Sequence, residues 1–415
     1  MAEDPIPTLA GVFNARLPDR EGLFQLSFSG ELLHSIDPMP AARPADPAGW
    51  IDAQGGLITP PFVDPHFHLD SVHSIDETGE NQSGTLLEGI ALWKAYKENL
   101  KPEQIYERAH RYCQEARRLG LQAIRSHVDV SYQSLAGVEA LTALREDWTG
   151  TIDIQLVAFP QDGFYRNPEG EALLLKALDA GIDVVGGIPH FERTYDEGTR
   201  SIDRICQIAA ERNLRVDLHC DETDDGSSHH VETLAAKTIE YQLVGRTAAS
   251  HTTSLHSAED AWFAKLLPLL KEAGLTIIPN PLINLTLQGR FDRYPKRRGI
   301  TRIPELDAAG IPVALGQDCV RDPWYPLGTG NLLDVAHMTV HGCQMTGVEQ
   351  MNRLLPMITQ NSAATMGLKG YSLQKGEPAH LLIFQESTFT DLLRIRPQPG
   401  TILRSAKITH PPVSA

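Results

Sequence analysis

The chain has 415 residues, 41% of them hydrophobic, and a formal net charge of −16 at neutral pH. This length suits two or three domains or one large barrel with an addition, and the apolar content is ample for a large core. The negative charge argues against electrostatic binding of a nucleic acid polymer. No run of about 18 uninterrupted apolar residues occurs, so we expect no membrane span and no membrane partner.

The cysteines and the first residues bear on where the protein works. The five cysteines are scattered, odd in number and form no C-x-x-C motif. This usage is typical of reduced thiols in a cytoplasmic protein. The first residues lack the basic and then apolar pattern of a secretory leader, so we expect a cytoplasmic location.

Residues 8–56 consist of short alternating segments broken by proline and glycine, which predicts the strands of a small β unit. From Leu57 onward, apolar runs alternate with segments of helical periodicity. The predicted helices are 84–100, 102–119, 135–146, 171–180, 201–212, 230–243, 258–273 and a short one at 303–309. The predicted strands are 57–63, 123–129, 152–159, 182–188, 215–220, 248–253, 275–278 and 311–316. We expect a long loop at 280–300.

Strands that alternate with helices form a parallel sheet, and eight such units indicate an α/β protein with a (β/α)8 TIM barrel. Residues 327–367 are again helical in pattern, and residues 370–410 return to short strands. We therefore expect a barrel over 57–368. The two chain ends, 1–56 and 369–415, are expected to pair as one small β-sandwich domain.

Polar side chains gather at the carboxyl ends of the predicted strands, which is where active sites of such barrels lie. His66 and His68 follow the first strand, and both imidazoles face the same way because side chains alternate along a strand. Alone, such a pair is more often two solvent-facing histidines than a metal site. Later strands end in further candidates, however. These are His127, Asp129, Gln161, His190, His219, Glu222, His251, Asn280 and Asp318.

Three histidines and one carboxylate fit a mononuclear Zn²⁺ or Fe²⁺ site that keeps one position for water. Such a metal lowers the pKa of bound water from about 15.7 to about 7, which provides a nucleophile at neutral pH. Glu222 lies three residues beyond His219, a spacing that suits acid–base work near that water. No lysine stands at the end of the fourth strand, so a binuclear site with a carboxylated lysine is not expected.

Several other catalytic motifs are absent from the sequence. There is no G-x-G-x-x-G after a strand and no G-x-x-x-x-G-K-[ST], which argues against a nucleotide cofactor or a phosphate loop. There is no G-x-S-x-G elbow. The H-x-E…P-C-x-x-C pattern of a different class of zinc deaminases is also missing.

The stretch from Pro61 to Asp70 resembles the metal-binding motif of the amidohydrolase superfamily. Other stretches are similar to bacterial cytosine deaminases. They are 81–86, 157–161, 188–192, 219–222, 249–253, 287–292, 294–301 and 322–329. The resemblance runs from about residue 55 to 370, and it implies a barrel of amidohydrolase type that acts on a small pyrimidine base.

Carried over by position, the resemblance implies one divalent metal, Zn²⁺ or Fe²⁺. The ligands that it implies are His66, His68, His219 and Asp318. Gln161 would bind the carbonyl edge of the pyrimidine, Glu222 would move a proton to a ring nitrogen, and His251 would orient the attacking water. Asp318 would also take a proton from that water and pass it to the leaving amino group.

The resemblance further places Leu86, Phe159 and Trp324 at the substrate pocket. One position departs from the pattern, because Cys319 stands where the family usually has a second aspartate. A thiol is smaller than a carboxylate and behaves as a weakly polar hydrophobe. We therefore expect Cys319 to leave room for a 5-methyl or 5-halo substituent on the ring.

The sequence thus predicts metal-dependent hydrolytic deamination of cytosine and 5-substituted cytosines, with release of ammonia. 5-Methylcytosine would give thymine, and 5-fluorocytosine would give 5-fluorouracil. The alternative is a deaminase of another amino-heterocycle, of the isoguanine, isocytosine, creatinine or aminotriazine type. An inactive scaffold protein is disfavoured because the proposed ligands and the glutamate occur together. We also expect a closed homo-oligomer, and the resemblance points to a hexamer.

Overall fold

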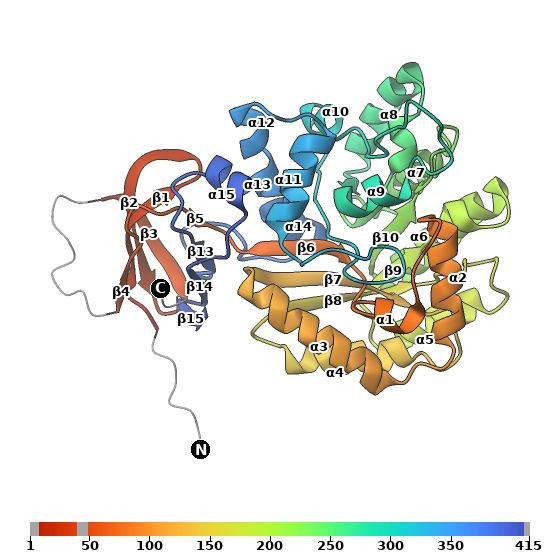
Figure 1. Ribbon diagram of the computed structural model, residues 1–415, viewed down its shortest axis with the longest axis horizontal. Helices are drawn as coiled ribbons and strands as arrows, with labels where there is room; N and C mark the ends of the chain where they lie inside the picture. The colour runs from red at the N-terminus through yellow and green to blue at the C-terminus, as the bar shows by residue number, and fades with distance from the viewer. Residues whose placement is uncertain (1–7, 40–48, 411–415) are drawn as a thin grey trace.

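The computed structural model describes residues 8–39 and 49–410. A barrel with helices around it occupies most of the molecule, and a smaller β unit built from both ends of the chain lies beside it (Figure 1). Within the described ranges, no helix has both the length and the apolar character needed to cross a bilayer.

The barrel is built on a parallel sheet with the strand order β12-β11-β10-β9-β8-β7-β6. These strands are β6 (Phe62–Phe67), β7 (Leu121–Asp129), β8 (Asp153–Phe159), β9 (Val184–Gly187), β10 (Arg215–Cys220), β11 (Thr247–His251) and β12 (Thr276–Ile278). The expected eighth strand makes only isolated bridges, from Val313 to Ile277 of β12 and from Asp318 to Phe67 of β6. The eighth segment therefore fills the gap between the two edge strands, and the predicted TIM barrel is confirmed.

Helices surround the sheet, and most begin and end close to the predicted positions. They are α1 (Ile75–Thr78), α2 (Leu86–Lys97), α3 (Pro102–Arg118), α4 (Ala136–Asp147), α5 (Gly170–Asp179), α6 (Tyr195–Arg212), α7 (His230–Glu240), α8 (Asp260–Glu272), α9 (Pro281–Leu287), α10 (Ile303–Ala308), α11 (Leu332–Gly342), α12 (Val348–Asn352), α13 (Leu354–Met357), α14 (Gln360–Met366) and α15 (Phe389–Ile395). Two 3₁₀ turns follow β9 and β11. They are η1 (Pro189–Phe191) and η2 (Thr253–His256).

Helices α1 and α15 were not predicted, and helices α6 and α9 also differ from the sequence prediction. Helix α6 begins before Ser201 because the hydroxyl oxygen of Thr194 accepts a hydrogen bond from the backbone of Glu197 and caps the helix there. The predicted loop at 280–300 is wrong at its start, where α9 forms. Pro281 stands at the first position of α9, where its missing N–H costs no hydrogen bond. With seven residues, α9 is too short for its periodicity to stand out in the sequence.

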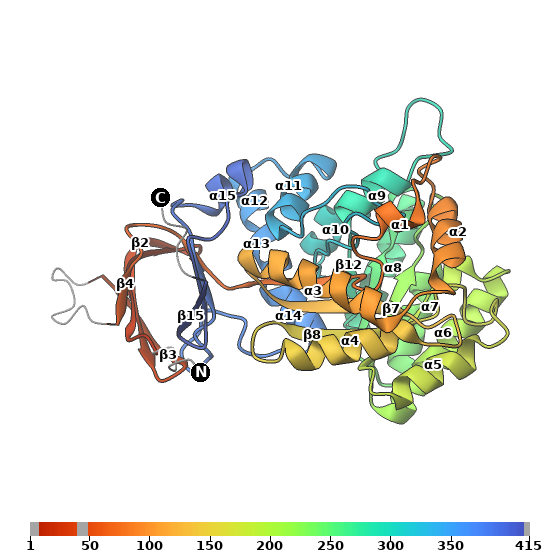
Figure 2. The ribbon, with the colours of Figure 1, turned by 60° about the horizontal axis from the view of Figure 1, so that its bottom comes forward.

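The small β unit consists of two four-stranded sheets, β3-β2-β1-β4 and β15-β14-β13-β5, which face each other (Figure 2). The strands of the chain's first part are β1 (Gly11–Leu17), β2 (Arg20–Ser29), β3 (Leu32–Pro38), β4 (Trp50–Asp52) and β5 (Ile58–Thr59). Those of its last part are β13 (Leu381–Ile383), β14 (Thr401–Arg404) and β15 (Lys407–His410). The small β-sandwich domain expected from the two chain ends is confirmed.

The exact domain bounds, 1–56, 57–368 and 369–415, remain our proposal. Strand β5 pairs with β13 although it lies just beyond residue 56, so the border between the two parts falls within a continuous stretch of chain. Residues 1–7, 40–48 and 411–415 of the expected β domain lie outside the described residues.

Strand β13 joins the β sandwich to the barrel. Leu381 and Ile383 pack in the core of the sandwich, whereas Leu382 and Phe384 belong to the main core of the barrel. This division follows from the alternation of side chains along a strand. Strand β13 therefore packs against both parts of the molecule, and β14 does the same through Ile402 and Leu403.

We predict that Leu382→Ala destabilises the whole molecule by about 2–5 kcal/mol, because it opens a cavity beneath a fully buried side chain. Leu32→Ala on β3 makes the same chemical change at a side chain that is 44% exposed, and it should cost far less. Urea unfolding followed by circular dichroism measures both. Equal midpoints for the two variants would contradict the shared core.

Candidate active site

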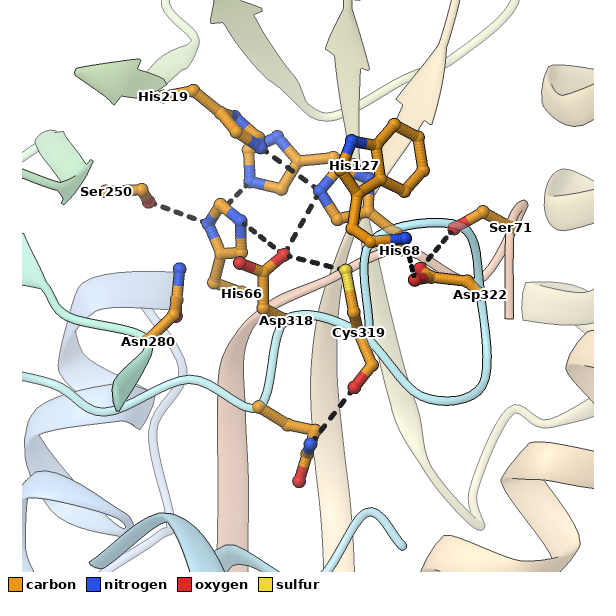
Figure 3. Close-up of polar contacts among 12 residues, drawn as sticks. His66, His68, Ser71, His127, His219, Ser250, Asn280, Asp318, Cys319 and Asp322 are labelled. Atoms are coloured by element: carbon orange, nitrogen blue, oxygen red, sulfur yellow. Dashed lines mark hydrogen bonds and ion pairs between the residues drawn. The ribbon is translucent and has the colours of Figure 1, made fainter. Parts of the chain in front are cut away.

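The polar residues predicted at the strand ends converge at one mouth of the barrel. His66 and His68 come from the end of β6, His219 from the end of β10, and Asp318 from the bridge that closes the barrel. Figure 3 shows these four side chains turned toward one another. Their convergence results from barrel closure, because residues far apart in sequence meet where parallel strands end.

The distances in this cluster are short. The Nε2 atoms of His66 and His68 each lie 3.4 Å from Oδ1 of Asp318. The Nε2 atoms of His68 and His219 are 3.1 Å apart. Ligand atoms of a group that includes His251 all lie within 4.8 Å of one another, and such a group can hold a metal ion. The members of this group are His66, His219, His251 and Asp318.

The protonation of the cluster suits metal binding. Burial lowers the pKa of His68 to about 4 and brings those of His219 and His251 well below their usual range, so these imidazoles are neutral at pH 7. Neutral imidazole is the form that binds metal. The Nε2 atom of His66 is buried and has no hydrogen-bond partner within the described ranges. Nitrogen and oxygen donors of this kind fit Zn²⁺ or Fe²⁺.

A buried pocket opens next to this cluster. It contains most of the residues that the sequence placed at the substrate. Its predicted lining residues are His68, Leu86, Gln161, His219, Glu222, His251, Asp318, Cys319 and Trp324. His66 is 0% exposed and lies behind the pocket wall. Phe159 does not line the pocket. It stacks on the ring of His219 instead, with centroids 4.1 Å apart, and so packs behind that imidazole.

Three apolar lining residues were missed by sequence reasoning, namely Ile188, Ile283 and Leu287. Ile188 follows β9 directly, so its place at a strand end was the signal that could have found it. Ile283 and Leu287 belong to α9, in the segment predicted to be a loop. The apolar wall that they form makes the pocket suitable for a flat, weakly polar ring.

Glu222 and His251 form the acid–base part of the site. Oε1 of Glu222 lies 3.4 Å from Nδ1 of His251, and Nε2 of His251 lies 3.7 Å from Oδ2 of Asp318. Burial raises the pKa of Glu222 well above its usual range, and the charge of Asp318 adds to the shift. This shift favours the protonated carboxyl, the form in which Glu222 can act as an acid.

His251 is oriented by two amides. Asn284, from α9, lies with its Nδ2 3.0 Å from Nδ1 of His251, and Asn280 approaches the same ring at 3.4 Å. Both His251 and Asp318 have a backbone φ of 69°, in the left-handed region that such residues rarely adopt. The surrounding contacts hold these two residues in that conformation. Strain of this kind is common at active sites.

Cys319 lies at the pocket beside Asp318. Its side chain is buried, and its thiol donates to Oδ1 of Asp318 over 3.5 Å. Burial raises the pKa of this thiol well above its usual range, and Asp318 adds to the effect. Cys319 is therefore a neutral thiol and not a nucleophilic thiolate.

Other strand-end candidates lie outside the pocket lining. Asp129 accepts hydrogen bonds from Trp93 (2.9 Å) and Lys97 (2.7 Å), both on α2. These contacts fasten α2, which carries Leu86, against the barrel. Asp129 is thus in a supporting position, away from the reacting groups.

Comparison with known proteins places this geometry in a family. The model of the amidohydrolase family matches residues 49–402 of the chain. The chain belongs to the amidohydrolase family. The resemblance inferred from the motifs is confirmed, and the protein is a hydrolase that acts on carbon–nitrogen bonds.

Three individual proteins show which amidohydrolases this chain is similar to. A crystal structure of 5-methylcytosine deaminase from Klebsiella pneumoniae, liganded with 5-fluorocytosine, superposes with a TM-score of 0.94 at 41% identity over 98% of each chain. N-isopropylammelide isopropyl amidohydrolase from Pseudomonas sp. (strain ADP) is 29% identical over 89% of each chain. Pterin deaminase from Rhizobium rhizogenes (strain K84 / ATCC BAA-868) is also 29% identical, over 94% of this chain and 89% of its own.

We predict that the purified protein carries one divalent metal per chain and that His219→Ala loses most of it. Glu222→Gln is the matched control, because it alters a buried polar residue of the same pocket that we do not place among the ligands. Metal analysis by mass spectrometry measures both variants. Loss of metal from Glu222→Gln would show that Glu222 is itself a ligand.

Proposed function

We propose that this amidohydrolase deaminates cytosine and 5-substituted cytosines by hydrolysis. The observation that carries the proposal is one pocket in which Gln161, Glu222 and Cys319 adjoin the histidine–aspartate cluster, that is, His66, His68, His219 and Asp318. The similarity to the Klebsiella 5-methylcytosine deaminase supports the same chemistry. In the reaction, water adds to C4 of the base, the amino group leaves as ammonia, and the 4-oxo base remains.

Different residues of the site carry out different steps of this reaction. A divalent metal, when bound by His66, His68, His219 and Asp318, supplies a Lewis acid that activates water at neutral pH. The carboxylate of Asp318 takes a proton from the attacking water and delivers it to the departing amino group. The ring of His251 lies beside Asp318, with its Nε2 3.7 Å from Oδ2, and orients the same water.

Glu222 supplies the second proton. Burial raises the pKa of its carboxyl and so favours the protonated form, which can donate to N3 of the ring as the water adds to C4. The tetrahedral intermediate then forms without a negative charge on the ring nitrogen. When the amino group leaves as ammonia, the hydroxyl on C4 gives its proton to the Glu222 carboxylate, which forms the 4-oxo group and restores the acid. Gln161 binds the carbonyl edge of the base, and Trp324 and the apolar lining residues hold its faces.

Another amino-heterocycle is the second candidate for the substrate. Two curated relatives at 29% identity carry the names of a pterin deaminase and an N-isopropylammelide hydrolase. Both are less similar to this chain than the Klebsiella structure is. A panel of free bases separates these possibilities.

We predict that the protein, loaded with Zn²⁺ or Fe²⁺, releases ammonia from cytosine. Glu222→Gln should lower kcat by about 100- to 10,000-fold, as expected for loss of a general acid. An enzyme-coupled ammonia assay with cytosine, isoguanine, isocytosine, creatinine, an aminotriazine and pterin measures the preference. Turnover of another base in this panel, with none of cytosine or its 5-substituted forms, would contradict the assignment.

Cys319 is proposed to set the preference at C5 of the ring. A carboxylate in its place would be bulkier and would lose solvation against an apolar 5-substituent. The neutral thiol avoids both effects, because it is small and weakly polar. 5-Methylcytosine and 5-fluorocytosine should therefore be turned over at rates comparable to that of cytosine.

We predict that Cys319→Asp reduces kcat/KM for 5-methylcytosine by about 10- to 200-fold, the value of one methyl group in such a pocket, while cytosine turnover is kept. Measuring both substrates on both proteins gives the ratio directly. An unchanged ratio would show that another residue sets the preference.

A further inference from the structure

A buried ion pair and a serine lie inside the barrel next to the histidine–aspartate cluster. Arg125, Asp217 and Ser250 are on β7, β10 and β11, just before His127, His219 and His251 of the same strands. The three side chains are at most 1% exposed. Barrel interiors are usually filled by branched apolar residues, and a buried ion pair adds little net stability over an apolar replacement. Stability alone therefore does not explain this group.

These residues form a chain of hydrogen bonds that ends on His66. Arg125 Nη1 donates to Oδ2 of Asp217 over 2.8 Å, and the hydroxyl of Ser250 donates to Oδ1 of the same carboxylate over 2.8 Å. The Ser250 oxygen lies 2.7 Å from Nδ1 of His66 (Figure 3). A carboxylate only accepts hydrogen bonds, so the single hydroxyl hydrogen of Ser250 points to Asp217. Toward His66, Ser250 can then only accept.

This direction decides where His66 carries its hydrogen. A neutral imidazole has one N–H, and an acceptor at Nδ1 draws it to that atom. The Nε2 atom keeps a free lone pair, and Nε2 is the atom that faces Asp318 at 3.4 Å. The Nε2 atom of His127, which lies 3.0 Å from the same Nδ1, must then act as an acceptor too.

The same contacts argue against a second metal. The ligand atoms of a second group all lie within 4.8 Å of one another, so by distance alone it could also hold a metal ion. This group consists of His66, His127 and Asp217. The Nδ1 atom of His66 is already bonded to Ser250, however, and the carboxylate of Asp217 is bonded on both oxygens. The group is therefore suited to orienting His66 and not to holding an ion of its own.

We propose that Ser250, itself oriented by Asp217, is a positioning residue that fixes the tautomer of His66 and so presents Nε2 to the metal. This role rests on the metal site of the proposed function. Groups that hold a metal-binding histidine in place typically change metal affinity by about 10- to 100-fold when they are removed.

The test compares Ser250→Ala with wild-type protein and with Ser201→Ala. Ser201 is also a buried serine, whose hydroxyl donates to the backbone of Gly198 over 2.8 Å on α6, outside the barrel. Each protein is stripped of metal and titrated with Zn²⁺ against a chromophoric chelator. We expect S250A to bind Zn²⁺ about 10- to 100-fold more weakly and S201A to match wild type. Metal-free S250A and S201A should melt within a few degrees of each other.

Each outcome bears on a separate claim. Unchanged Zn²⁺ affinity in S250A would overturn the positioning role while leaving the proposed function intact. An equal loss in S250A and S201A would also overturn it, because a general loosening of the fold would then explain the effect. Wild-type protein that binds neither Zn²⁺ nor Fe²⁺ would overturn the proposed function together with this role.

Discussion

The burial of several imidazoles around one carboxylate is the constraint on which the rest of this structure depends. His66, His68, His219 and His251 come from three strands, and each lies in contact with Asp318 or with a neighbouring ring. In this dry setting protonated histidines are unfavourable, and burial lowers the pKa values of His68, His219 and His251, which are therefore neutral. A divalent cation is the partner that such a set of donors fits, and this need accounts for a strongly polar group inside a barrel core.

The supporting contacts follow from the same constraint. A metal-binding ring must point a lone pair inward, so it needs an outer partner that holds its other nitrogen. Ser250 is suited to do this for His66. Asn284 instead donates to Nδ1 of His251, so this ring carries its hydrogen on Nε2, the atom that faces Asp318. The amide comes from a short helix, and the hydroxyl from a strand inside the barrel. Rigid elements thus position the ligands, which is the arrangement that precise chemistry requires.

The pocket is defined by the segments that follow the strands. Helix α2 contributes Leu86 and is fastened by Lys97 and Trp93 to Asp129, while α9 contributes Ile283 and Leu287. Family members with this barrel carry names that refer to different heterocycles. In the proposed function, the metal and acid–base residues of the barrel carry out the reaction, and the side chains on these segments, together with Cys319, select the ring.

The sequence by itself determined the alternation of strands and helices, because the period of apolar residues is a local property that each segment carries. It also determined that His66 and His68 share a face and that polar residues stand at strand ends. Only the tertiary structure decided that Asp318 lies 3.4 Å from both histidines, that α9 walls the pocket, and that Ser250 reaches His66. The physical reason is that these contacts join residues far apart in the chain. Their distances depend on how the last segment closes the barrel between β12 and β6, which no local pattern encodes.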